Sequence, residues 1–365
     1  MDFTRTDAAQ DLSGLVTTIV DAVCTPQHQR QLDSLDQRFD KTLWGKLIDA
    51  DILSTAAPES VGGAGFGVLE QTAILTPLGR QVAAVPYLES VVLGAGALAH
   101  FGSDRLRQDW AVPAVAGEKI LTVALDGEWG QGPVQATASD DGYRLTGTRT
   151  QVPWGPIADA FLVAAETNSG TKVFLVSAGD PGVSITALET TGQGSAGEVD
   201  LAGVHLGADR VVGDGDVLTW LIARRAVGLT AYQLGVLERS LELTAEYART
   251  REQFDRPIGS FQAVSQRLAD AYIDIKGLRL TLEQASWRLS EDLPADTEVA
   301  TAAFWAAEAG HRVAHTTVHV HGGVGIDMDH QVHRYFITAK QTEFALGGAT
   351  AGLLVIGRDL ADTPA

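Results

Sequence analysis

The spacing of apolar residues divides the chain into three blocks. In the first block, Leu15, Ile19 and Val23 recur at four-residue intervals, and helical spacing continues to about residue 117. A glycine-rich break at residues 62–67 interrupts this pattern. We therefore expect an N-terminal helical domain over residues 1–118.

The middle block consists of short runs rich in β-branched and aromatic residues, separated by turn signals. Asp140-Asp141-Gly142 and Asn168-Ser169-Gly170 stand where hairpin turns belong. The expected strands are Ile120–Leu125, Tyr143–Val152, Phe161–Ala165, Lys172–Ser177, Val183–Leu188 and Glu198–Leu206. We expect residues 119–213 to form a small antiparallel β domain, either a sandwich or a barrel.

The last block is helical again. The runs 218–251, 261–289 and 298–321 are long enough for an up-and-down four-helix bundle within residues 214–365. The sequence therefore predicts an α+β fold, in the order helical domain, β domain and helical bundle.

Composition excludes several classes of protein. The chain has 27 basic and 46 acidic residues and a formal net charge of −19, which disfavours nucleic-acid partners and anionic membranes. The single cysteine, Cys24, allows neither an intramolecular disulfide nor a cysteine-based zinc site, as is usual in a reducing cytosol. We find no signal peptide and no uncharged apolar run of about 18 residues, so we expect a cytoplasmic protein without a membrane span.

The segment from Arg251 to Gln262 closes one predicted helix and opens the next. It offers a guanidinium group at Arg251, an aromatic ring at Phe254 and a primary amide at Gln262. Arginine can bind a phosphate through two hydrogen bonds, and a helix N-terminus attracts anions, so the segment could bind a diphosphate. It could also be a helix–loop–helix connection with solvated charges, which is what composition alone favours.

A second candidate site combines histidines and glycines near the end of the third long helix. His315 and His319 can share a helix face, but no suitably spaced carboxylate completes a metal site with His321, so we predict no metal. The segment could be a helix C-terminus with a glycine stop. Alternatively, Gly322 and Gly323 could allow the backbone to approach a ligand phosphate.

Taken together, these segments resemble the acyl-CoA dehydrogenase family over nearly the whole chain. Residues 58–65 resemble its N-terminal signature, residues 251–262 its C-terminal signature, and residues 321–325 followed by Arg334 its Gly-Gly-x-Gly segment. The resemblance implies the family's fold and an FAD cofactor, whose adenosine diphosphate part reaches a neighbouring subunit. It also implies α,β-dehydrogenation of an acyl-CoA, in which a glutamate removes the α proton and hydride passes to the flavin.

The resemblance also assigns cofactor contacts to particular positions of this chain. Position 319 is usually glutamine in the family, and the histidine found here can still donate a hydrogen bond. The implied FAD-binding residues are Arg251, Gln253, Phe254, Gln262, His319, Gly322 and Gly323.

The catalytic base is where the chain departs from the family. The usual glutamate precedes a Gly-Thr pair and falls near Gly347, where the sequence has no carboxylate, and Glu343 is out of register. The alternative position, used by isovaleryl-CoA dehydrogenase, falls close to Arg225, whose guanidinium group cannot act as a base near neutral pH. We therefore predict that this chain lacks the catalytic base.

The flavin-ring segments of the β domain depart as well. Residues 125–133 replace a Thr-Glu-x-x-Ala-Gly-Ser-Asp-like segment, and residues 150–155 replace a Trp-Ile-Thr-Asn-like strand. Pro153 removes a backbone donor there and is expected to break the strand locally. The half of the site that holds the flavin ring is thus degraded, whereas the half that reaches a neighbour's FAD is kept.

This division resembles the non-catalytic subunit of actinobacterial heterotetrameric (α₂β₂) acyl-CoA dehydrogenases, which act on steroid (cholesterol) side-chain CoA thioesters. The resemblance implies a homologous α subunit as partner, an acyl-CoA substrate and an electron-transfer flavoprotein as acceptor. Two alternatives remain open: a self-sufficient homotetrameric dehydrogenase that uses Glu343 or another carboxylate, and a flavin-free scaffold or thioester-binding module.

Overall fold

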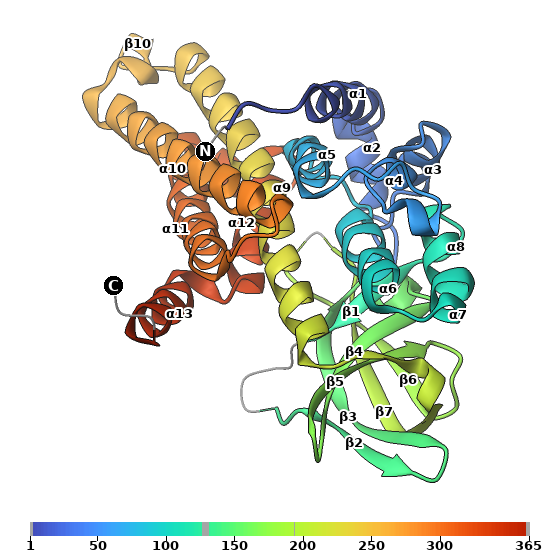
Figure 1. Ribbon diagram of the computed structural model, residues 1–365. Coiled ribbons are helices and arrows are strands. Elements are labelled where there is room, and N and C mark those ends of the chain that lie inside the picture. Colours follow the sequence, from blue (N-terminus) through green and yellow to red (C-terminus); the bar gives the residue numbers. More distant parts are fainter. Residues whose placement is uncertain (1–2, 126–130, 193, 363–365) are drawn as a thin grey trace.

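The computed structural model describes residues 3–125, 131–192 and 194–362 (Figure 1). The N-terminal helices and the β domain lie on one side of the molecule, and the C-terminal helices lie on the other. Helix α9 (Gly215–Thr250) is 36 residues long and runs from beside the β domain to the far end of the bundle (Figure 1). This arrangement confirms the predicted α+β fold with its central sheet and its helical C-terminal region.

The N-terminal part is built from short helices around one large apolar core. Helix α1 begins after Thr6, whose hydroxyl accepts a hydrogen bond from the backbone N–H of Ala9, and it buries an apolar stripe that includes Val16 and Val20. The elements are α1 (Asp7–Val23), α2 (Pro26–Leu32), α3 (Lys41–Asp49), α4 (Ile52–Thr55), η1 (Glu59–Val61), α5 (Val68–Arg80), η2 (Tyr87–Ala95), α6 (Gly96–Phe101), α7 (Asp104–Leu106), η3 (Arg107–Ala111) and α8 (Val112–Val115). Element η2 is a π-helix, a rare form that is frequent at functional sites.

The β domain holds an eight-stranded sheet in the order β6-β7-β3-β2-β4-β5-β8, with β1 beside β4. Hairpins join β2 to β3 and β4 to β5, which confirms both predicted turns. Strands β1 and β2 each pair in parallel with β4, so the sheet is mixed and not wholly antiparallel as predicted. The strands are β1 (Leu121–Ala124), β2 (Val134–Ser139), β3 (Gly142–Pro153), β4 (Ala160–Thr167), β5 (Gly170–Ser177), β6 (Val183–Leu188), β7 (Ala196–Gly207) and β8 (Val211–Gly213).

Strand β3 corrects the expectation of a break at Pro153. The strand continues through Pro153, which pairs with Ala196 at the end of the ladder, where a missing N–H disturbs no further pairing. The irregularity lies earlier, between Arg149 and Val152, where Gln151 has a φ of 53°. The strand therefore bulges within the segment expected to cover a flavin ring, ahead of Pro153.

The C-terminal part contains α9, α10 (Gln262–Ser290), α11 (Asp296–His321) and α12 (Val332–Ala345), with α13 (Gly348–Asp362) packed against α11. A short hairpin of β9 (Glu252–Gln253) and β10 (Arg256–Pro257), followed by η6 (Ile258–Ser260), connects α9 to α10. Element η7 (Gly322–Ile326) follows α11. The buried amide of Gln233 donates to the carbonyl oxygens of Ala306 and Ala339, which ties α9 to α11 and α12.

Helices α12 and α13 reach the length and apolarity of a membrane span only when residues 332–362 are counted as one helix. A turn with φ of 81° at Gly347 and 78° at Gly348 separates them into helices of 14 and 15 residues. A span needs about 20 residues, so neither helix suffices alone. Helix α13 instead exposes large apolar side chains, including Leu353, Leu354 and Leu360.

Candidate cofactor site

The two segments predicted to bind the cofactor meet at one end of the bundle. The ring of Tyr247, near the end of α9, stacks on the ring of His321, at the end of α11, with centroids 4.4 Å apart. The helix ends that lead into the hairpin and into η7 are therefore neighbours.

The α9–α10 connection is held by its own contacts and points its polar groups outward. The backbone N–H of Ile258 donates to the carbonyl of Arg251 at 2.8 Å, and the guanidinium of Arg256 lies 4.1 Å from the ring centre of Phe261. Phe254, at the hairpin tip with a φ of 56°, is 87% exposed. Within the described part of the chain, the exposed Arg251 guanidinium makes no hydrogen bond or ion pair.

Gln253 and Gln262 are exposed on the same connection. The Gln253 amide donates only to the neighbouring carbonyl of Glu252, at 2.8 Å. Gln262 is the first residue of α10, where the free backbone N–H groups of a helix attract anions. Arg251, Gln253, Phe254 and Gln262 thus lie together on one exposed surface that a neighbouring molecule can reach.

The glycines after α11 differ in what surrounds them. Gly322, with a φ of 63°, and Gly323 are exposed, and a Cβ added at either position would meet no atom within 4 Å. By contrast, a Cβ at Gly325 would come within 2.9 Å of the Cα of Val318, so that glycine serves packing. The N–H of Gly322 donates to the carbonyl of Val318, so it is the exposed backbone at Gly323, near exposed His319, that fits the approach of a diphosphate.

The three histidines take different roles. His321 is buried, and its Nδ1 lies 2.9 Å from the carbonyl oxygen of Thr317. Burial lowers the pKa of His321, which favours its neutral form. His315 is exposed and contacts His311, with ring centroids 4.5 Å apart. Gly322 ends α11, as the helix-terminus interpretation expects, and binding of a ligand phosphate at this segment stays a prediction.

The positions expected for a catalytic base carry no suitable carboxylate. Gly347 lies in the turn between α12 and α13, beside the apolar Leu346. Glu343 is held on α12 by an ion pair with Lys340, and its Oε1 lies 3.3 Å from the Nδ1 of His311. Arg225, near which the alternative base was expected from the sequence, lies in the first half of α9.

The structure brings one further carboxyl group to Arg225 that sequence reasoning missed. Glu89, in the π-helix η2, accepts a hydrogen bond from the indole Nε1 of Trp154 at 3.1 Å. Burial raises the pKa of Glu89 to about 7, although the charge of Arg225 and the hydrogen bond from Trp154 act in the opposite direction. The sequence could have indicated Glu89 as a candidate, because it is the one charged residue in the apolar run 82–99.

Trp154, directly after β3 in the β domain, borders the region around Glu89. It has a φ of 57°, its N–H donates to the carbonyl of Ser195 at 2.8 Å, and its ring packs edge-on against Phe39. Of the replaced segment 125–133, residues 126–130 lie outside the described residues.

Two family profiles match the chain. The profile for "Acyl-CoA dehydrogenase, N-terminal domain" matches residues 6–118, and the profile for "Acyl-CoA dehydrogenase, C-terminal domain" matches residues 213–361. Together they cover both helical parts of the molecule.

Several known proteins are similar over their full length. Acyl-CoA dehydrogenase FadE27 from Mycobacterium tuberculosis is 71% identical over 100% of both chains, and FadE28 from the same organism is 30% identical over 98% of both. Among solved structures, a chain of the ChsE4-ChsE5 complex from Mycobacterium tuberculosis has a TM-score of 0.98 at 72% identity, covering 100% of both chains. A variant of the Tcur3481-Tcur3483 steroid ACAD has a TM-score of 0.93 at 37% identity, covering 98% of this chain and 99% of that one.

Proposed function

The chain belongs to the acyl-CoA dehydrogenase family, and on this premise we propose that it is the subunit of a heterotetramer that lacks the catalytic base. In this proposal it contributes FAD contacts to a homologous partner chain, which supplies the glutamate and the flavin-ring site. The similarity to a ChsE4-ChsE5 complex and to a steroid ACAD supports a hetero-oligomer and a steroid side-chain CoA thioester as substrate.

The observation that carries the proposal is the contrast between the two ends of α9. At its far end, Arg251 and Gln262 are exposed, and they lie near the open backbone of Gly322. At its near end, Arg225 lies where a base is expected, and Trp154 is buried with its indole bonded to Glu89. One end is thus available to a neighbour's cofactor, while the other has a guanidinium where the reaction needs a base.

The residues at the far end fit the diphosphate of FAD, the cofactor of this family. Arg251 can pair with a phosphate, and the backbone N–H of Gly323 can donate to its oxygens. When bound, FAD accepts the hydride that the acyl-CoA loses, and an electron-transfer flavoprotein is the proposed next acceptor. In the heterotetramer, this chain's own task is to bind and orient the adenosine end of the partner's cofactor.

Exposed apolar side chains show where partner chains can pack. Helix α10 exposes Tyr272, Ile273 and Leu280, and η7 with the following loop exposes Ile326 and Met328. Large exposed apolar patches mark interaction sites in soluble proteins, and these side chains are candidates to form one. Interfaces of obligate complexes typically bury more than about 2,000 Å².

Native mass spectrometry with a flavin count tests the proposal. The chain co-expressed with a homologous partner should form a tetramer of two copies of each chain with two FAD molecules, and the chain expressed alone should hold little flavin. Four FAD molecules on a tetramer of this chain alone would refute it and establish a self-sufficient enzyme.

The position of Glu89 favours that second candidate function. A carboxyl group with a pKa near 7 beside the expected base position could act as a general base. The turnover of the Glu89→Gln variant, measured in the co-expressed protein, distinguishes the two candidate functions. Loss of a general base should lower turnover by at least about 10²-fold, whereas the proposed heterotetramer should keep most of its activity.

A further inference from the structure

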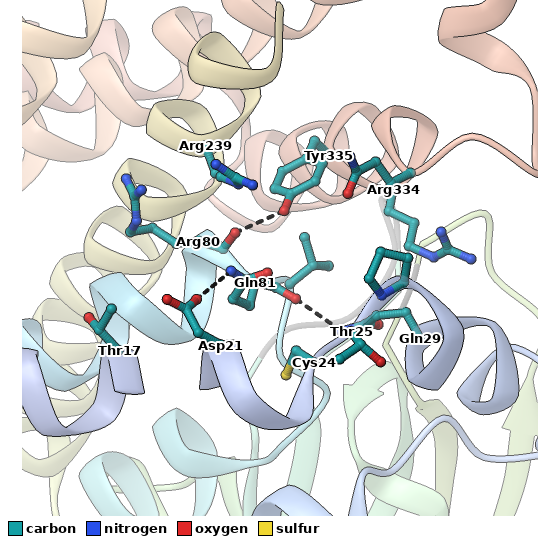
Figure 2. A pocket seen from close by; sticks show the side chains of 13 residues that line it. Thr17, Asp21, Cys24, Thr25, Gln29, Arg80, Gln81, Arg239, Arg334 and Tyr335 are labelled. Atoms are coloured by element: carbon teal, nitrogen blue, oxygen red, sulfur yellow. Dashed lines mark hydrogen bonds between the residues drawn. The ribbon is translucent and has the colours of Figure 1, made fainter. Parts of the chain in front are cut away.

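A cavity separate from the candidate cofactor site lies between the N-terminal helices and the C-terminal bundle. Its volume is about 470 Å³, and its walls come from α1, α2, the end of α5, α9 and the start of α12 (Figure 2). Pockets of 300–1,000 Å³ between domains are typical small-molecule sites. None of its lining residues is among the positions assigned to FAD contacts, although Arg334 follows the Gly-Gly-x-Gly segment.

Three arginines line this cavity in a strongly acidic chain. Arg80 and Arg239 lie on one side, and Arg334 lies at the other (Figure 2). Asp21 supplies the one carboxylate among the described lining residues, and the amide of Gln81 donates to it at 2.6 Å. The wall therefore carries a formal charge of +2, against −19 for the whole chain.

The carboxylates that pair with these arginines lie outside the lining. Glu242 pairs with Arg80 at 2.9 Å and with Arg239 at 3.1 Å. Glu238 also pairs with Arg80, at 3.4 Å, and Asp33 pairs with Arg334. These pairs fix the guanidinium groups from behind. The pair of Arg239 with Glu242 is partly exposed and hence weak, so it leaves Arg239 able to bind a further anion.

Uncharged polar groups complete the wall. Thr17, Thr25 and Gln331 add hydroxyl and amide groups, and the Tyr335 hydroxyl, which donates to the carbonyl of Arg80 at 2.9 Å, borders the space. Arginine binds phosphate and carboxylate groups through two parallel hydrogen bonds, which lysine cannot do. From this lining we infer that the cavity binds a small oxyanion, a metabolite that carries a phosphate or carboxylate group.

Isothermal titration of the purified full-length protein, in its assembly, tests this inference. The probes are inorganic phosphate and citrate, with glycerol as the uncharged control. We expect saturable binding of at least one anion, one molecule per copy of this chain, and no binding of glycerol. Tighter binding of phosphate would identify a phosphoryl ligand, and tighter binding of citrate a carboxylate ligand.

Two variants locate the bound anion in the cavity. Arg239→Gln removes a guanidinium group, and Gln331→Glu adds a negative charge at the N-terminus of α12, where an acidic residue favours the helix. Each should weaken anion binding at least about ten-fold, whereas Arg105→Gln, an exposed arginine outside the cavity that also pairs with aspartates, should not. The absence of saturable binding, or binding that both cavity variants leave unchanged while thermal unfolding shows them folded, would overturn the inference.

Discussion

Gly323→Ala separates the proposed cofactor role of η7 from a merely structural one. The backbone of Gly323 has no positive φ, and an added Cβ would meet no atom within 4 Å. Alanine is therefore compatible with the fold, and replacing such a glycine stabilises a protein by about 0.4–1 kcal/mol because it restricts the unfolded chain.

Cofactor binding should change in the opposite direction. If the diphosphate of FAD approaches the backbone here, the new methyl group occupies space that the phosphate oxygens need. Loss of one hydrogen bond to a charged group costs about 1.5–3 kcal/mol, which weakens FAD binding roughly 10- to 150-fold.

The assay measures FAD affinity by flavin fluorescence and stability by thermal unfolding of the apoprotein. Gly215→Ala is the matched control, because its Cβ also meets open space and it lies at the opposite end of α9. An unchanged FAD affinity in Gly323→Ala with intact stability would refute the assignment of this loop to the cofactor. A fall in stability would refute the inference that the fold accommodates a Cβ at position 323.

Three further predictions concern individual side chains. Arg251→Ala and Gln262→Ala should each lower FAD occupancy about ten-fold under limiting FAD, as absorbance of the purified complex will show, because each removes a proposed cofactor contact. Glu343→Gln should leave steady-state turnover largely intact, since Lys340 and His311 already hold this carboxylate; a loss of 10²-fold or more would make it the base. Burial raises the pKa of Glu89 to about 7, so its protonated form stabilises the fold below about pH 4 and this contribution is lost as the pH rises to 7. The stability of Glu89→Gln relative to the parent chain should therefore increase by on the order of 2 kcal/mol from pH 5 to pH 8, as measured by denaturant unfolding. An equal stability difference at both pH values would contradict the raised pKa of Glu89.

The sequence predicted the long helices well because their ends carry strong local signals. Helix α11 ends at His321, which is the predicted end, because Gly322 follows it. The hairpin with Pro257 separates α9 from α10. Strand β2 was missed because its side chains are mostly exposed, with only Val134 and Ala136 buried, so it shows no apolar run. The parallel pairing of β1 with β4 depends on contacts between distant segments, which periodicity does not report.

The site was predictable only where its residues are close in sequence. The segments around Arg251 and Gly322 each form a motif, although their mutual contact through Tyr247 and His321 became visible only in the fold. Glu89 reaches Trp154 across 65 residues, and no spacing rule connects them. The arginine-lined cavity combines residues of five elements, and it has no sequence signature for the same reason.

Helix α9 fixes the distance between the near and far positions of the proposed catalytic unit. Arg225 and Arg251 are separated by 26 residues, almost all within this continuous helix, which corresponds to roughly 39 Å along its axis. The near and far positions are therefore separate places on one chain. In the proposed heterotetramer this chain uses only the far position, so the loss of function at the near one need not disturb it. Evolution could thus remove catalysis at the near position and preserve the FAD contacts of the far one without changing the architecture of the tetramer.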